Sequence, residues 1–308
     1  MSKRATSGRP GTARRALNPQ AADRLLVYEF DRGSNYEEDT RLTTALSALL
    51  PEEQLVHPDQ RLFQSVHLIS EYAWAAMHYE MCRAVQLLDE GDFLLAAQVL
   101  ERSAALGRIP VQALNTLVEF LPQTGLLAMR ESFPPNTTGL DSPGARNLRR
   151  AAQPLWRAFT RALEREERTP DDLITAQGRT SRPATDDRPA VELALVRQGL
   201  MRLDAAVGDW KQLHLRLVWG QLGGHPEAEP LAASAPGPRS EAGPHTAHGR
   251  GPSGAGPDAA GGCPVLPTSL RGESTLSLRK MAERTLFPQL WDSVDAIYRR
   301  LVPAEPAS

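Results

Sequence analysis

The chain of 308 residues is poor in cysteine, with only Cys82 and Cys263. Neither cysteine belongs to a CxxC pair, so the sequence carries no disulfide framework and no thiolate zinc site. This cysteine usage is typical of a reducing compartment. We therefore expect a cytoplasmic protein.

Long hydrophobic runs and an excess of positive charge are also missing. No stretch of about 18 apolar residues occurs, which argues against a membrane-spanning segment, and no secretory signal is visible. The formal net charge is −2 and the isoelectric point is about 6.4. Because proteins that neutralise phosphates carry excess Lys and Arg, we expect neither a nucleic acid nor a membrane as partner.

Strand patterns are nearly absent, and helical periodicity dominates. We expect a disordered basic tail over residues 1–22 and a single all-α domain over residues 23–308. The Gly/Pro/Ala/Ser-rich segment 223–262 is too poor in large apolar side chains to repay its ordering entropy, which predicts a mobile loop insertion. The predicted helices cover residues 60–90, 93–121 with a kink or a short break at Pro110, 146–168, 190–221 and 276–301.

One predicted helix places a histidine on an apolar face. In the stretch "LDAAVGDWKQLHLRLV", His214 shares its face with hydrophobic side chains at alternating spacings of three and four residues. An imidazole there must find a hydrogen-bond partner, a metal or a ligand, because an unpaired buried polar group costs about 1–3 kcal/mol. The residues of this face are Leu200, Leu203, Val207, Trp210, His214 and Leu217.

A second histidine lies in a similar setting on the first long helix. His67 follows the same spacing among Phe63, Ser70, Trp74, Met77 and Met81. For either histidine alone, a core imidazole with a satisfied hydrogen bond is the simpler interpretation. Two such histidines on well-separated helices indicate a shared cavity.

Several kinds of catalytic site lack their motifs. The sequence has no HExxH and no repeated ExxH pattern for zinc or di-iron, no GxSxG and no glycine-rich phosphate loop. Glu71 lies one turn after His67, but a solvated or capping carboxylate explains it better than a metal ligand. The remaining candidate is a cofactor that needs one strong protein ligand, a flat apolar slot and a polar group opposite, which are the requirements of haem.

Four stretches resemble motifs of the tryptophan 2,3-dioxygenase superfamily, the haem-dependent aromatic oxygenases. They occur in the family's order between residues 63 and 291, about three quarters of the chain. The stretches are "FQSVHLISEYAW" from residue 63, "AMRESFPPNTTGLDSPGAR" from residue 128, "LDAAVGDWKQLH" from residue 203, and "GGCPVLPTSLR" with "TLFPQLW" from residues 261 and 285.

The resemblance implies an all-α helical bundle that encloses a b-type haem. His214 matches the family's axial ligand to the haem iron, and Trp74 is expected to bind the cofactor. His67 matches the distal histidine, which acts in catalysis. The family also forms homo-oligomers, so the resemblance implies a dimer or tetramer in which the N-terminal segment of one subunit helps to close a neighbouring site.

For the substrate, the resemblance implies an aromatic amino acid that reacts with O2. Phe63 would lie against the aromatic ring, and Arg130 would bind the α-carboxylate. Gly261 and Gly262 belong to the glycine-rich substrate loop. The implied activity is a dioxygenase-type oxidation of L-tryptophan or a close indole derivative.

Several positions depart from the family pattern. Leu126 replaces a Tyr or Phe, Leu140 replaces a Phe, Ala260 replaces a Thr, and Cys263 and Pro264 replace serines. A hydroxyl near the substrate ammonium is therefore missing. These departures leave a second hypothesis open, a haem-dependent monooxygenase or hydroxylase of tyrosine or a modified tryptophan in a natural-product pathway. A third hypothesis is a non-catalytic helical binding protein in which both histidines are ordinary core residues.

Overall fold

The computed structural model describes residues 16–30, 35–130, 132–133, 142–179, 187–223, 225 and 275–301. Within these ranges the chain is helical, and the only β-type pairing is an isolated bridge between Ala16 and Glu29. The predicted all-α class is confirmed. None of the helices in these ranges is both long and apolar enough to cross a membrane.

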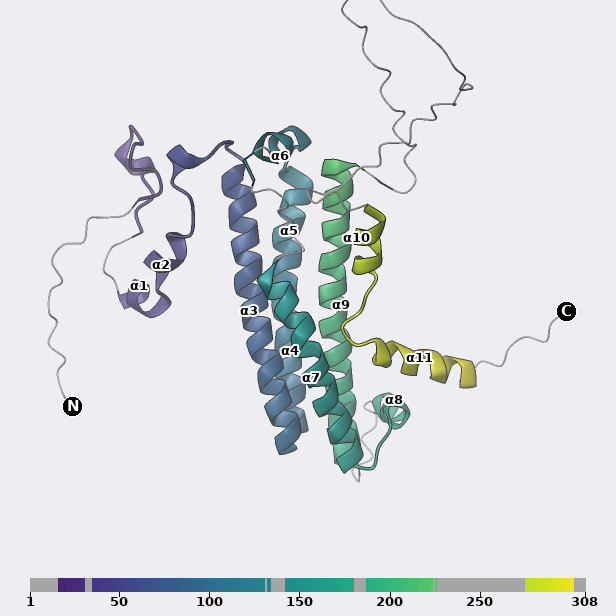
Figure 1. Ribbon diagram of the computed structural model, residues 1–308. Coiled ribbons are helices and arrows are strands. Elements are labelled where there is room, and N and C mark those ends of the chain that lie inside the picture. The colour runs from purple at the N-terminus through teal and green to yellow at the C-terminus, as the bar shows by residue number, and fades with distance from the viewer. Residues whose placement is uncertain are drawn as a thin grey trace, which may run out of the picture.

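The body of the protein is a bundle of long helices that run side by side (Figure 1). Helix α3 contacts α4, α5 and α7, and α9 contacts α4 and α5. Two shorter helices, α6 and α8, contact α9 at opposite ends. The bounds are α3 Gln60–Glu90, α4 Phe93–Leu106, α5 Arg108–Phe120, α6 Gln123–Arg130, α7 Pro143–Arg165, α8 Pro170–Arg179 and α9 Arg188–Leu222.

The first long helix has the predicted bounds, but the break in the second lies elsewhere. Helix α3 ends at Gly91, whose φ of 86° is the left-handed conformation that glycine adopts without strain. The predicted break at Pro110 is wrong, because α4 ends at Leu106 and Pro110 lies in the first turn of α5. A proline in a first turn loses no hydrogen bond, so the chain breaks before it, at Gly107.

Two further boundaries differ from the sequence prediction. Helix α7 begins at Pro143, three residues before the predicted start, because the Ser142 hydroxyl caps it by accepting from the Ala145 N–H at 3.1 Å. The polar connection after residue 168 contains helix α8. There the Asp172 carboxylate accepts from the Thr169 N–H and hydroxyl at 2.8 and 2.7 Å.

The C-terminal region contains two helices where the sequence predicts one. Helices α10 (Thr275–Ala282) and α11 (Pro288–Leu301) are separated by a turn. Pro288 opens α11 because a proline inside a helix would remove a donor and clash with the preceding turn. The single helix predicted over residues 276–301 is therefore wrong. Helix α10 lies along α9, whereas α11 turns away from it (Figure 1).

The N-terminal region forms an arm beside the bundle (Figure 1). It contains short helices and is tied to α3, where the Gln64 amide accepts from the Leu50 N–H at 3.1 Å and donates to the Ala48 carbonyl at 3.0 Å. Residues 1–15 of the predicted tail and most of the predicted 223–262 insertion lie outside the described residues. The arm comprises η1 Arg24–Leu26, α1 Asn35–Thr40, α2 Leu42–Leu46 and η2 Glu52–Gln54.

The apolar core has two parts that meet at Trp210. The larger cluster is built mainly by α3, α4, α7 and α9 around Trp74 and Phe159. A smaller cluster around Leu117 and Met129 fills the end covered by α6. Trp210 is partly buried and packs against both clusters. The junction between the two clusters is therefore near the middle of α9, close to His214.

Two glycines of α9 offer a test of this packing. A Cβ added at Gly199 would lie 2.8 Å from the Leu100 Cβ of α4, whereas one at Gly208 would meet nothing within 4 Å. We expect Gly199→Ala to destabilise the fold by about 1–3 kcal/mol through overpacking. Gly208→Ala should instead stabilise it by up to about 1 kcal/mol, because alanine favours the helix. Urea unfolding measures the change in the free energy of unfolding for each variant. Equal changes in the two variants would contradict the close contact of α4 with α9.

Candidate functional site

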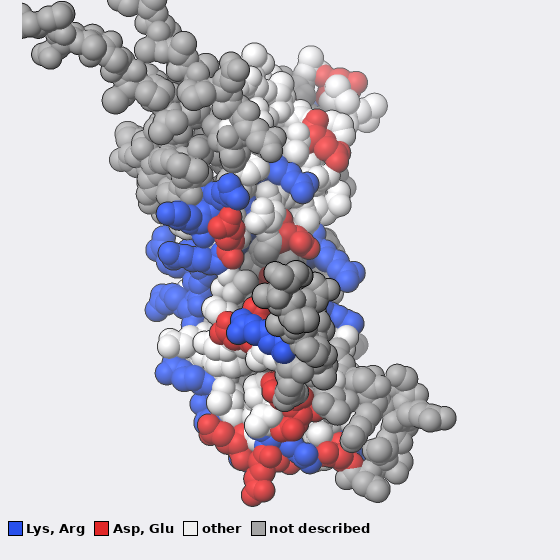
Figure 2. All heavy atoms as spheres, turned by 90° about the vertical axis from the view of Figure 1, so that its right-hand side faces the viewer, with Lys and Arg blue, Asp and Glu red and all other residues white. Residues whose placement is uncertain are grey.

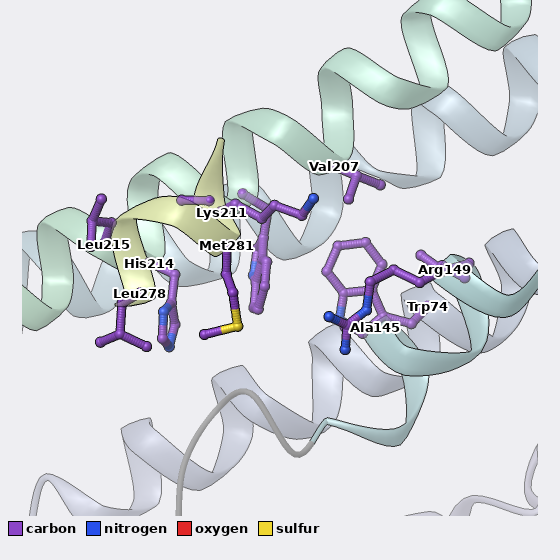
Figure 3. Close-up of a pocket in the computed structure, with 12 residues that line it drawn as sticks. Trp74, Ala145, Arg149, Val207, Lys211, His214, Leu215, Leu278 and Met281 are labelled. Carbon is purple, nitrogen blue, oxygen red and sulfur yellow. The ribbon is translucent and has the colours of Figure 1, made fainter. Parts of the chain in front are cut away.

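Two neighbouring cavities lie where the core clusters meet. The larger has an empty volume of about 650 Å³, partly open to solvent, and lies among α3, α7, α9 and α10 (Figure 3). The smaller, of about 340 Å³, lies on the α3 side. Trp74, Trp210 and His214 line both cavities.

His214 presents an imidazole without a partner to this space. Its ring stacks on Trp210 with centroids 5.3 Å apart, but within the described part of the chain no hydrogen bond involves either ring nitrogen. Burial, with a smaller contribution from the His67 charge, lowers the pKa of His214 to about 4. The ring is therefore neutral at pH 7 and carries a lone pair that no described protein group uses.

His67 reaches the smaller cavity from α3 with one nitrogen already bonded. Its Nδ1 lies 2.7 Å from the Phe63 carbonyl oxygen. Because a carbonyl only accepts, Nδ1 must carry the hydrogen, which leaves a lone pair on Nε2. Burial lowers the pKa of His67, against the opposing effects of the Phe63 carbonyl and the Glu71 charge. The predicted shared cavity is present, since His67 and His214 both line it.

Phe63 packs against the His67 ring. The two ring centroids are 4.2 Å apart, and Phe63 also stacks on Phe133 at 5.2 Å. Arg130 is the last residue of α6, and its backbone carbonyl accepts from the Phe133 N–H. Phe63 and Arg130 do not line either cavity, whereas His67, Trp74 and His214 do. The structure thus brings three of the predicted site residues together.

Glu71 connects the site to α7. Its carboxylate accepts from the Ser142 hydroxyl and, at 2.9 Å, from the Gly144 N–H. A carboxylate at a helix N-terminus satisfies free amide groups and interacts favourably with the helix dipole. The interpretation of Glu71 as a capping carboxylate is confirmed, and the helix that it caps is α7 rather than its own.

Asp204 is a structural residue of the site that sequence reasoning missed. It is buried, and its carboxylate accepts from the Leu286 N–H at 2.6 Å and from the Trp291 indole N–H at 2.7 Å. These bonds fix the turn between α10 and α11, and α10 supplies the cavity wall at Leu278 and Met281. The signal was present, because Asp204 and Trp291 each belong to a motif stretch quoted above.

Removing this carboxylate should loosen the turn. We expect Asp204→Ala to lower the free energy of unfolding by about 3–5 kcal/mol, since two part-buried donors lose a buried, charged acceptor. At about 2–4 °C per kcal/mol, this predicts a melting temperature lower by about 6–20 °C. Asp209→Ala on the same helix is the control, because Asp209 is exposed. A fall no larger than that of the control would contradict the role of Asp204.

The low pKa of His214 predicts acid sensitivity of the ligand-free chain. An imidazole with a pKa near 4 in the fold and 6.5 when unfolded takes up its proton first in the unfolded state. The free energy of unfolding should therefore fall as the pH drops from 6.5 towards 4. In the His214→Leu variant, the free energy of unfolding should fall less over this pH range. Urea unfolding midpoints measured at pH 7 and at pH 5 in both proteins test this. Equal losses in both proteins would mean that His214 titrates normally in the fold.

Other predicted positions lie outside the described residues. They include Gly261 and Gly262, together with the departures at Leu140, Ala260, Cys263 and Pro264. Leu126 is described and packs, partly buried, against the smaller core cluster. No group of three or more His, Cys, Asp or Glu in the described ranges could hold a bare metal ion.

Positive charge gathers beside the larger cavity. Helix α7 exposes several arginines, and one of them, Arg149, lines the cavity together with Lys211 of α9. Figure 2 shows a column of Lys and Arg side chains along the left edge of the face that looks right in Figure 1. The exposed arginines of α7 are Arg146, Arg149, Arg150, Arg157, Arg161 and Arg165.

Comparison with protein-family models and with curated proteins gave no match. The assignment of a function therefore depends on the geometry of the cavities and on the motif resemblance.

Proposed function

We propose that the chain is a haem-dependent oxygenase that acts on an aromatic amino acid, in the manner of tryptophan 2,3-dioxygenase. One observation carries the proposal: His214 is neutral, has no hydrogen-bond partner among the described residues and lines the same cavity as His67. A neutral imidazole with a free lone pair can bind a metal, and haem iron takes such a ligand from the protein.

The residues present fit a b-type haem. His214 would be the axial ligand, held in place by the rigid helix α9. Trp74 and Trp210 provide aromatic walls, and Leu278 and Met281 close the apolar side. A porphyrin brings its own ring nitrogens to the iron, so a single imidazole from the protein is sufficient. Bound there, the haem would supply the iron that activates dioxygen.

The chain's own residues would position the substrate. The lone pair on His67 Nε2 can accept a hydrogen bond from the N–H of an indole or the O–H of a phenol, which orients the ring for reaction. Phe63 restrains the His67 ring by direct contact. Val66, Trp74 and Leu114 supply apolar walls beside His67 in the smaller cavity. Arg130 stays the proposed carboxylate partner on the motif resemblance, although it lines neither cavity.

The proposal is tested with L-tryptophan and O2 added to the haem-loaded, reduced protein. A dioxygenase inserts both oxygen atoms and needs no external reductant, so N-formylkynurenine should form without one. Absence of this product and of any hydroxylated indole would refute action on tryptophan. A chain that shows no Soret band after haem is supplied would instead be the non-catalytic helical protein.

A second candidate is a monooxygenase of tyrosine or a modified tryptophan. The departures from the family pattern favour it, among them Leu126, which packs against the smaller core cluster where the family has a Tyr or Phe. A monooxygenase inserts one oxygen atom and reduces the other to water, so it requires an external reductant, or peroxide in place of O2. Product mass with tyrosine, with and without reductant, separates this candidate from the dioxygenase.

We also propose that the protein forms a homo-oligomer, a dimer or a tetramer. The N-terminal arm exposes large apolar side chains: Leu25 is 92% exposed, Leu26 69% and Tyr28 54%. Such surface is normally covered in a soluble protein, and a second copy of the chain would cover it. Light scattering after gel filtration gives the oligomeric state. A monomer at micromolar concentration would contradict this assembly.

A further inference from the structure

The larger cavity combines an apolar interior with two cations. Leu148, Val207 and Leu278 supply apolar lining, while Arg149 extends from α7 towards the cavity and Lys211 reaches it from α9 (Figure 3). In the part of the chain that the structure describes, no carboxylate pairs with either cation. Among the described residues, the Lys211 ammonium donates to the Arg284 backbone carbonyl alone.

Arg149 and Lys211 repel one another at a site where burial partly removes Lys211 from water. Burial has the largest effect and lowers the pKa of Lys211; the charge of Asp204 then raises it, and the charges of Arg149 and Arg284 lower it further. Asp204 is already engaged by the Leu286 and Trp291 donors. This end of the cavity therefore carries positive charge that the described residues leave without a paired carboxylate, and a bound anion would relieve it.

From this arrangement, and resting on the function proposed above, we propose that Arg149 and Lys211 form an anion subsite that binds the propionate carboxylates of the haem. A ligand for this cavity needs a flat apolar body with carboxylates on one edge, and haem b has that form with two propionates. Lys211 precedes His214 by three residues, so both lie on one face of α9, about 4.5 Å apart along the helix axis.

The placement of the two cations determines the orientation of the ligand. Arg149 is exposed and Lys211 is partly exposed, so the carboxylate edge would lie at the mouth and the opposite edge inside. Arginine binds a carboxylate through two parallel hydrogen bonds, whereas lysine acts as a point charge. Arg149 would thus fix the rotation of the ligand about the iron–imidazole axis, and Lys211 would add affinity.

The test compares haemin with haemin dimethyl ester, which has the same ring and no free carboxylate. Both are titrated into the full-length apoprotein and followed by the Soret band. The wild type should bind haemin at least about tenfold more tightly than the ester, since each charge-assisted contact contributes at least that factor. The double variant Arg149→Gln/Lys211→Gln should lose this preference. The control is Arg157→Gln, an exposed cation of α7 away from the cavity, which should retain it.

Each other outcome has a distinct meaning. If the wild type binds both porphyrins equally, or if the double variant keeps the preference, the subsite assignment is wrong while the haem proposal stands. If neither porphyrin binds, both proposals fail. If the double variant keeps the haemin preference but weakens the spectral shift caused by L-tryptophan, the cations serve the substrate carboxylate, and the propionate assignment is overturned.

Discussion

Replacing His214 with alanine should abolish stable haem binding. The His214 imidazole is the only protein group that we propose to bind the iron. In the described lining of the cavities, α9 provides no second imidazole. Loss of an outer partner of a metal ligand already costs about 10- to 100-fold in affinity, so loss of the ligand itself should cost at least about 100-fold. The Soret band of purified, haem-supplied protein measures the effect.

Controls separate loss of the ligand from loss of the fold. His78→Ala on α3 should leave haem binding unchanged, because His78 contacts Cys82 and lines neither cavity. Helical circular dichroism should be equal in all variants. Added imidazole should restore part of the Soret band in the His214→Ala protein by occupying the vacated space. Haem retention equal to wild type in that variant would show that His214 is not the axial ligand.

Replacing His67 with alanine should have the opposite pattern: haem is retained and turnover falls. The imidazole offers its Nε2 lone pair to the substrate, and a positioned acid–base group typically contributes about 100- to 10,000-fold to the rate. We expect a loss of that size in kcat/KM with a Soret band like that of the wild type. His67→Gln should recover part of the activity, because its side-chain oxygen can accept the same hydrogen bond.

Two results would contradict this role for His67. If His67→Ala lost haem as completely as His214→Ala, His67 would help to hold the haem rather than position the substrate. If it kept haem and full turnover, the hydrogen bond to the substrate would not matter for the reaction. The pattern of the two variants together therefore tests the assignment of the two faces of the haem.

Local sequence pattern was sufficient for the elements that carry the histidines. Helices α3 and α9 match their predicted ranges almost to the residue, because each has a continuous apolar face and α3 ends at a glycine that tolerates a positive φ. That both histidines face one space followed from their matching positions among aromatic side chains. Periodicity reports which face of a helix is buried, and here this was enough to predict that the two histidines share a cavity.

The same pattern could not predict where helices break or what the polar groups bind. The turn before Pro288 is held by Asp204, which lies more than 80 residues earlier in the chain. Glu71 caps a helix that starts about 70 residues later. Propensities and periodicities describe neighbours in sequence, whereas these hydrogen bonds join residues that only the packed bundle brings together.

By itself, the sequence determined that this chain is helical and which imidazoles lie on its apolar faces, because both properties follow from residue type and spacing along one helix. Only the tertiary structure decided that the His214 nitrogens have no partner among the described residues. It also placed Arg149 and Lys211 at the mouth of the same cavity and left Arg130 outside its lining. These features depend on the distances between side chains of α3, α6, α7 and α9, which packing sets and the order of residues does not reveal.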